Sequence, residues 1–279
     1  MSGTLYLVGT PIGNLSDLSP RAKQILASVD FIAAEDTRVS LKLLNHFDIR
    51  RPLVSYHEHN RAQSGEKILT RLLAGESCAL VTDAGMPAIS DPGEDLVRLC
   101  AEHDVTVSPV PGPSACIAAL AASALPTQRF CFEGFLSTAK KSRAEHLREL
   151  KDEKRTMIFH EAPHKLVRTL ADMLAAWGDR DVAVCRELTK LHEQFFRCTL
   201  SEALAYYEQN PPKGEFVLVV RGAEEAAAPE MTRAEALELV KRLRGEGMRL
   251  KDACREAAEA AGLATNELYQ AALRESSGD

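Results

Sequence analysis

The chain has 279 residues, of which 45% are hydrophobic and 27% are charged, and its formal net charge is −6 at pH 7. This length is sufficient for two domains with their own cores, and the acidic balance excludes nucleic-acid binding through bulk charge. No run of 18 apolar residues occurs, and residues 1–10 lack the basic segment that begins a secretion signal. We therefore expect a cytoplasmic protein with no membrane segment.

The seven cysteines form an odd number and contain no CxxC pair. Most of them lie in apolar runs, which is typical of buried, reduced thiols. We predict neither disulfides nor a zinc site.

In the first 125 residues, short apolar strands alternate with helical segments, which indicates an α/β domain. Ser19 followed by Pro20 has the N-cap and first-turn residues of a helix. Strands are expected at residues 5–8, 31–34, 53–56, 78–81 and directly before 110, and helices at 61–73, 95–103 and 114–125, the last packed against the sheet. Polar and glycine-rich residues follow the strands, so they should gather at one edge of the sheet.

Two loops at that edge hold the main signal, VTDAGMPAISDPG at residues 81–93 and VPGPSA at 110–115. Open α/β sheets bind their ligands at the carboxyl ends of the strands. Gly85 and Gly112 lack a Cβ, so the backbone could approach a ligand closely, and the prolines make both loops stiff. The loops predict a small-molecule pocket built mainly from main chain, and the alternative is two ordinary turns.

After a hinge at Pro126 and Thr127 the α/β alternation restarts, with a hairpin that predicts a more mixed sheet. Strands are expected at residues 130–132, 156–159, 182–185, 194–200 and 214–220, with helices at 139–151, 165–176 and from 201. Residues 223–229 have the composition of a linker, and Thr232 with Glu235 forms a capping box. Three short helices follow, at 232–244, 250–261 and 265–274. We expect two α/β domains, 1–125 and 126–222, and a helical module, 230–279, whose pattern fits a helix-turn-helix or a plain packing bundle.

Three short motifs match the residue patterns of known sites but lack the structural context that those sites need. His160 and His164 fit the zinc pattern HExxH, but the segment follows a strand and Pro163 between them disfavours a helix, so a polar loop at a strand end is the better interpretation. The pair His57 and His59 has no third ligand nearby in sequence. Residues 9–13 follow a strand but have neither the glycine pattern of a dinucleotide site nor the lysine of a P-loop. Metal and nucleotide-hydrolase chemistry are therefore disfavoured.

Several motifs together resemble a known family. LYLVGTPIGNLSDLSPRA, AAEDTR, SYHEHN, VTDAGMPAISDPG, VPGPSA, FEGFL, HEAPH and RELTKLHE follow one another over residues 4–222. The chain is similar in this order of motifs to the ribosomal RNA small-subunit methyltransferase I group of the tetrapyrrole methylase superfamily.

The resemblance implies the class III methyltransferase fold, with S-adenosylmethionine in the cleft between two α/β domains, and a homodimer. It implies 2′-O-methylation of a cytidine ribose in the decoding region of 16S rRNA, within the small ribosomal subunit. The alternative inside the same superfamily is methylation of a small tetrapyrrole. A second alternative is a non-enzymatic nucleic-acid binder whose α/β part senses a metabolite.

The resemblance also places the cofactor contacts. They are Pro11, Gly85, Met86, Pro87, Ala88, Ile89, Ser114, Ala115, Phe159, Arg186 and Gly214. The tetrapyrrole enzymes usually have Gly-Asp-Pro where this chain has Gly85-Met86-Pro87, which favours the rRNA group.

Methyl transfer is an in-line displacement that needs positioning and no metal. A ribose hydroxyl is a poor nucleophile, so a base that accepts its proton would help. The candidates at predicted strand ends are Glu35, Asp36, Asp83, Glu133 and Glu161. The alternatives are that these carboxylates only cap helices or bind Arg38, and that positioning alone is sufficient.

RNA contacts would have to come from local basic groups. Those nearest the predicted cleft are Arg38, His57, His59 and Arg61, and a charged helix adds Lys140, Lys141 and Arg143. A solvated helix face is the alternative for the last three.

Overall fold

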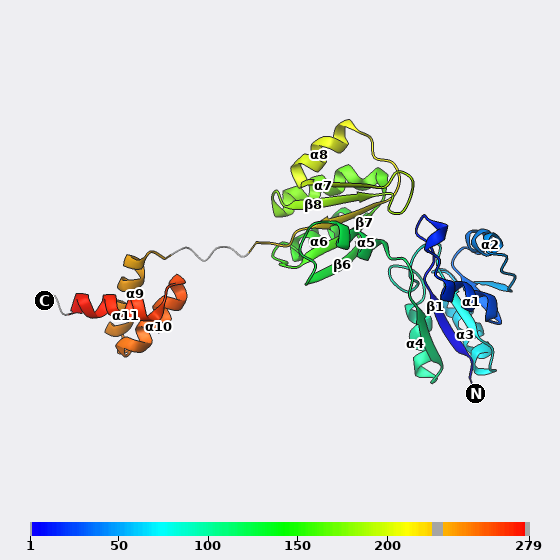
Figure 1. Ribbon diagram of the computed structural model, residues 1–279, viewed down its shortest axis with the longest axis horizontal. Coiled ribbons are helices and arrows are strands. Elements are labelled where there is room, and N and C mark those ends of the chain that lie inside the picture. Colours follow the sequence, from blue (N-terminus) through cyan, green and yellow to red (C-terminus); the bar gives the residue numbers. More distant parts are fainter. Residues whose placement is uncertain (1, 225–230, 277–279) are drawn as a thin grey trace. The chain divides into compact units, whose positions relative to one another are not determined.

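The computed structural model describes residues 2–224 and 231–276, and these form two compact units that divide after Gly222 (Figure 1). The first unit holds two five-stranded sheets, and the second holds three helices. The predicted linker at 223–229 lies mostly outside the described residues. Each unit has its own hydrophobic core and is described separately below.

The first sheet is wholly parallel, with strand order β3-β2-β4-β1-β5. Its strands are β1 (Thr4–Val8), β2 (Phe31–Ala34), β3 (Leu53–Ser55), β4 (Cys78–Val81) and β5 (Thr106–Val110). Every residue of β2 and β4 is buried, because helices cover both faces of the sheet and side chains alternate between two cores. Such a sheet leaves only its ends free for a ligand.

Four helices cover this sheet. Helices α1 (Pro20–Ser28) and α2 (Thr37–His46) contribute to the core on one face, and α3 (Arg61–Leu73) and α4 (Glu94–Glu102) to the core on the other. A short 3₁₀ helix, η1 (Leu15–Asp17), follows β1. The predicted start of α1 is confirmed, since Ser19 accepts a hydrogen bond from the backbone N–H of Ala22 and Pro20 opens the helix.

The second sheet has the strand order β6-β7-β10-β8-β9 and is mixed, as predicted. Its strands are β6 (Phe130–Phe135), β7 (Thr156–Glu161), β8 (Asp181–Arg186), β9 (Gln194–Thr199) and β10 (Phe216–Val220). Only β6 and β7 pair in parallel. One face packs on α6 (Lys140–Glu149), α7 (Pro163–Trp177) and α8 (Leu200–Gln209).

The other face of the second sheet packs on α5 (Ala115–Ala122). This helix directly follows β5 of the first sheet, and the sequence places it against that sheet. The structure corrects this prediction, because Cys116, Ala119 and Leu120 pack with Ile158 and Ala183 of the second sheet. The small side chains of α5 let it lie close to its strands. The two sheets are thereby joined through α5 as well as through the hinge.

The second unit contains α9 (Arg233–Gly245), α10 (Leu250–Ala261) and α11 (Thr265–Ser276). The predicted capping box is confirmed, since Thr232 and Glu235 each bond the other's backbone N–H. Gly262 ends α10 in the left-handed conformation and allows the turn into α11. Alanine and leucine side chains form its core, so the module has its own packed interior.

The described residues were searched for disulfides, metal-binding groups and membrane-spanning helices. All seven cysteines are free. Over 2–224 and 231–276, no group of three His, Cys, Asp or Glu side chains is arranged to hold a metal. No helix in these same ranges has the length and apolar character needed to cross a membrane.

Candidate active site

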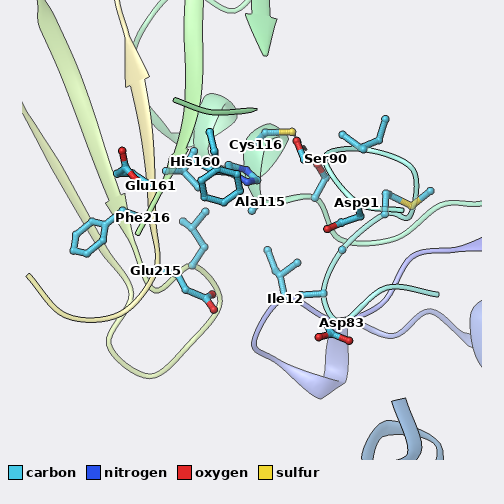
Figure 2. Close-up of a pocket in the computed structure, with 18 of the residues that line it drawn as sticks. Ile12, Asp83, Ser90, Asp91, Ala115, Cys116, His160, Glu161, Glu215 and Phe216 are labelled. Carbon is cyan, nitrogen blue, oxygen red and sulfur yellow. Dashed lines mark hydrogen bonds between the residues drawn. The ribbon is translucent and has the colours of Figure 1, made fainter. Parts of the chain in front are cut away.

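A cavity of about 430 Å³ lies between the carboxyl edge of the first sheet and the second sheet. Figure 2 shows Asp83 and Asp91 on one side of it, and His160, Glu161 and Phe216 on the other. The first-sheet wall is formed by Ile12, Glu35, Asp83, Ala84, Gly85, Met86, Ile89, Ser90, Asp91, Ser114, Ala115 and Cys116. The second-sheet wall is formed by Phe132, Phe135, His160, Glu161, Ala162, Pro163, Leu188, Glu215, Phe216 and Val217.

The loops after β1, β4 and β5 are packed backbone against backbone. A Cβ on Gly9 would lie 2.6 Å from the Cα of Gly112, so neither glycine leaves room for a side chain. Thr10 and Gly85 exchange two backbone hydrogen bonds, of 2.9 and 3.2 Å. The backbone N–H and C=O of Gly85 are thus both engaged with Thr10, and this glycine joins two loops at the border of the cavity.

The loop between β4 and α4 has an unusual backbone. Ala88 and Ser90 have φ values of 67° and 62°, and Gly93 has 147°. L-residues rarely adopt this region, and such strain concentrates at functional sites. In this conformation the loop brings Ile89, Ser90 and Asp91 into the cavity wall.

Three carboxylates lie on the first-sheet wall. Burial is the main cause of the raised pKa of Glu35 and of Asp83, and repulsion between neighbouring carboxylates adds to it. Burial, with the charges of Glu35 and Asp83, raises the pKa of Asp91 to about 6. The sequence prediction missed Asp91, although it lies in the same loop as Asp83 and directly before Pro92. This wall therefore suits a cationic ligand.

Glu161 borders the cavity, but its oxygens are already bonded. Its side chain is 3% exposed and accepts hydrogen bonds from Thr169 Oγ1 (2.5 Å) and from the N–H of Ala162 (2.8 Å). Arg143 donates to the same threonine oxygen. Glu161 thus belongs to a buried polar network beneath α7.

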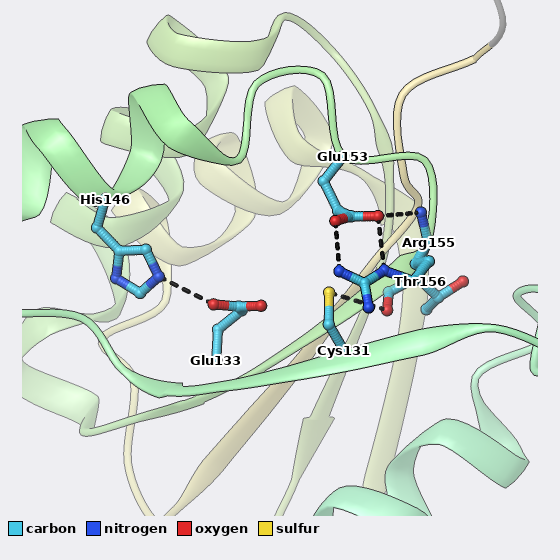
Figure 3. A network of polar contacts seen from close by, with 6 residues as sticks. All are labelled: Cys131, Glu133, His146, Glu153, Arg155 and Thr156. Carbon is cyan, nitrogen blue, oxygen red and sulfur yellow. Dashed lines mark hydrogen bonds and ion pairs between the residues drawn. The ribbon is translucent and has the colours of Figure 1, made fainter.

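The two remaining candidate bases lie away from the cavity lining. Glu133 accepts a hydrogen bond from His146 of α6, at 3.0 Å, as Figure 3 shows. It points to the α6 face of the sheet, opposite to Phe132. Asp36 caps α2 and pairs with Arg38, whose guanidinium lowers the pKa of that carboxyl. Both side chains have structural partners.

The second-sheet wall is mainly apolar, and its titratable residues are His160, Glu161 and Glu215. The His160 ring lies edge-on to Phe132 and Phe135, with ring centroids 5.1 and 5.4 Å away. Its Nε2 is buried and bonds no other described residue. Burial lowers the pKa of His160, so the imidazole is neutral near pH 7. Glu215 lies at the rim and pairs with Lys190.

Five of the predicted cofactor contacts line the cavity: Gly85, Met86, Ile89, Ser114 and Ala115. Six do not line it: Pro11, Pro87, Ala88, Phe159, Arg186 and Gly214. The Phe159 side chain points into the core beneath α7, beside Trp177, and the Arg186 guanidinium donates to the carbonyl of Lys213. Gly214 lies under the Glu187 carboxylate. These three residues are therefore already in contact with other parts of the protein.

Of the predicted RNA contacts, Arg38 is 87% exposed and pairs with Asp36, and Arg61 pairs with Glu58 and Asp95. His57, His59, Lys140 and Lys141 lie at or near the surface outside the cavity lining. The structure corrects the prediction for Arg143.

Arg143 is only 3% exposed, and its charge is engaged by Asp172 at 2.6 Å. A buried and paired guanidinium cannot also bind a phosphate. The sequence pattern counted its charge but could not show which face of α6 it lies on.

The sequence model of the tetrapyrrole (corrin/porphyrin) methylases matches residues 4–204. The chain belongs to this family. A second match covers residues 230–276 of this methylase and is described as the RsmI C-terminal HTH domain. The helical module is thus of the helix-turn-helix type.

Relatives cover nearly the whole methylase. A ribosomal RNA small subunit methyltransferase I of Synechocystis sp. is 49% identical over 272 residues, 97% of this chain and 98% of that protein. One of Thermotoga maritima is 47% identical over 222 residues, 80% of this chain and 100% of that protein. Uroporphyrin-III C-methyltransferase from Thermus thermophilus, complexed with S-adenyl homocysteine, shares the fold, with a TM-score of 0.56 and 19% identity over 78% of this chain and 97% of that one.

Proposed function

We propose that this methylase transfers a methyl group from S-adenosylmethionine to the ribose 2′-oxygen of a cytidine in the decoding region of 16S rRNA. The substrate is the rRNA within the small ribosomal subunit. The observation that carries the proposal is the cavity between the two sheets, together with relatives that are named for small-subunit rRNA methylation over nearly the full chain. The cytidine and the 2′-oxygen follow from the resemblance of the motifs.

The residues of the cavity fit the cofactor. A volume of about 430 Å³ lies within the range of small-molecule sites, about 300–1,000 Å³. S-adenosylmethionine supplies an electrophilic methyl group on a positively charged sulfur. Glu35, Asp83 and Asp91 face this charge from one wall, and Leu188 with Val217 offers apolar surface to the adenosine from the other. Without such a cation, burying these negatively charged carboxylates would cost free energy.

Of the five candidate bases, Glu35 and Asp83 line the cavity and accept only backbone hydrogen bonds. We assign to these two the role of electrostatic partners of the cofactor. Glu161 would instead fix the start of α7, since Thr169 and Ala162 bind both its oxygens. Glu133 and Asp36 would be structural.

The RNA has to approach past an acidic wall, so its phosphates need basic partners elsewhere. Arg38, His57, His59, Arg61, Lys140 and Lys141 are proposed for this role. We also propose a homodimer, as the resemblance implies, and a cytoplasmic location, as expected from the sequence.

The experiment that tests the proposal uses small ribosomal subunits from a strain that lacks this gene. They are incubated with the protein and S-adenosylmethionine labelled in the methyl group, and the rRNA is digested to nucleosides. Label in 2′-O-methylcytidine, or in a base-methylated form of it, is expected. Unlabelled subunits despite measured cofactor binding would contradict the rRNA substrate, and methylation of a uroporphyrinogen-type tetrapyrrole instead would support the alternative.

A further inference from the structure

His160 is the titratable side chain of the second-sheet wall that faces α5 and the cavity. Side chains along β7 alternate, so Phe159 points into the core beneath α7, whereas Ile158 packs on the α5 side. His160 shares the face of Ile158, and its pairing partner on β10 is Val217, which also lines the cavity. The fold therefore directs this imidazole into the site.

The imidazole is held in place, but one of its two ring nitrogens has no hydrogen-bond partner among the described residues. Phe132 and Phe135 contact the ring edge-on from β6, which restricts its rotation. Nε2 is buried and bonds no other group in the described part of the chain. A buried polar nitrogen without a partner is unfavourable, and such exceptions call for an explanation. A ligand hydroxyl that donates to this nitrogen would provide one.

The other titratable side chains of the second-sheet wall are already engaged. Both oxygens of Glu161 are bonded, and Glu215 at the rim pairs with Lys190. Glu35, Asp83 and Asp91 lie on the opposite wall, where the proposed function has them face the cofactor charge. A neutral imidazole has a free lone pair, can take up a proton and needs no metal.

We propose that Nε2 of His160 accepts the proton of the ribose hydroxyl during methyl transfer. A lone pair of the hydroxyl oxygen forms the new O–C bond, and the S–C bond of the donor breaks with its electron pair remaining on sulfur. The hydroxyl proton moves to Nε2 and leaves an imidazolium. This role rests on the proposed function and adds the catalytic base to it.

Several titratable groups line the same cavity as His160. They are Glu215 directly before β10, Cys116 from α5, and Glu35, Asp83 and Asp91 from the loops of the first sheet, whereas β6 contributes Phe132 and Phe135. Burial lowers the pKa of His160, and Glu215 opposes this shift. The rate should therefore fall as the pH decreases through a value below about 6.5, the ordinary pKa of histidine.

The test compares wild type with His160→Gln, which keeps a polar side chain but cannot take up the proton. Single-turnover methyl transfer to unmethylated small subunits is measured from pH 5 to 8, with cofactor affinity and thermal unfolding measured alongside. We expect a rate at least about 100-fold lower at pH 7.5, loss of the acid limb, and cofactor affinity within threefold of wild type. Asp91→Asn and Glu35→Gln should each retain the acid limb.

The outcomes separate the two proposals. If wild type methylates subunits and His160→Gln does so within threefold of its rate, His160 is not the base. Loss of the acid limb in Asp91→Asn or Glu35→Gln would likewise overturn the assignment. If wild type itself fails on subunits, the proposed function is wrong and the role of His160 falls with it. Should His160→Gln unfold, His160→Asn is measured in the same way.

Discussion

At the scale of single residues, the Asp91 carboxyl couples the site to pH. Its pKa is about 6 in the folded protein and about 3.9 in an unfolded chain. The folded state therefore binds more protons between these values, so the free energy of unfolding falls as the pH rises from about 4 to about 6 and remains lower above it. The negative charge of Asp91 therefore lowers the stability of the unliganded protein.

We expect Asp91→Asn to raise the free energy of unfolding of the unliganded protein at pH 7. The gain should be about 1–2 kcal/mol, since about two pKa units are involved and partial exposure reduces their effect. Urea denaturation at pH 7 and at pH 4 measures it. At pH 4 the gain should nearly vanish because the native carboxyl is then protonated, so an equal gain at both pH values would contradict this account.

A second residue-scale prediction concerns Arg143, which pairs with Asp172 and donates to Thr169. Arg143→Met should lower the free energy of unfolding by about 2–3 kcal/mol. This is below the usual cost of breaking a buried pair, about 3–5 kcal/mol, because Asp172 is 40% exposed. Urea denaturation at pH 7 measures the change.

The matched control is Lys141→Met, two residues earlier on the exposed part of the same helix. It should change the free energy of unfolding by no more than about 0.5 kcal/mol. If both variants have the same stability, the Arg143 network contributes nothing measurable.

At the scale of elements, the site depends on how closely the loops after β1 and β5 approach each other. Gly9→Ala would place a Cβ 2.6 Å from Gly112 Cα and 2.7 Å from Met86 Sδ. Backbone atoms cannot move aside as a side chain can, so the loops must separate. We expect a loss of about 2–4 kcal/mol in the free energy of unfolding, as for other overpacked sites.

The same change should weaken cofactor binding, since Met86 lines the cavity. Gly65→Ala is the control, because its Cβ would meet no atom closer than 3.8 Å and it lies within α3. It should stabilise the protein by about 0.5–1 kcal/mol. Calorimetric titration with S-adenosylhomocysteine measures cofactor affinity in both variants, and urea denaturation measures their stability. Weaker binding in Gly65→Ala but not in Gly9→Ala would contradict this prediction.

At the scale of the whole molecule, the methylase unit and the helical module each have a separate core. The relative of Thermotoga maritima matches only 80% of this chain over its own full length. We expect the fragment 1–222 to fold alone and to bind S-adenosylhomocysteine within threefold of the full chain. Calorimetric titration and thermal unfolding of the two proteins test this, and a fragment that is unfolded would show that the module is needed for folding.

The sequence by itself determined the local structure of this protein. Period-2 and period-3.6 patterns, N-caps and turn residues act within a few residues, so β4, α3 and α10 begin and end where the sequence predicts. The order of motifs also identified the family, and the cavity edge at the strand ends was predicted from the loops after β4 and β5.

Only the tertiary structure decided contacts between distant segments. Whether α5 packs on the first or the second sheet, and whether Arg143 faces Asp172 or solvent, depends on neighbours that the local pattern does not specify. Gly85 has no side chain that would keep a ligand away from its backbone, yet its N–H and C=O both bond to the backbone of Thr10. His160 gains its place in the site only because β6 and β10 lie beside β7 and α5 covers the same face. Periodicity fixes which residues share a face, and the pairing of elements fixes what that face meets.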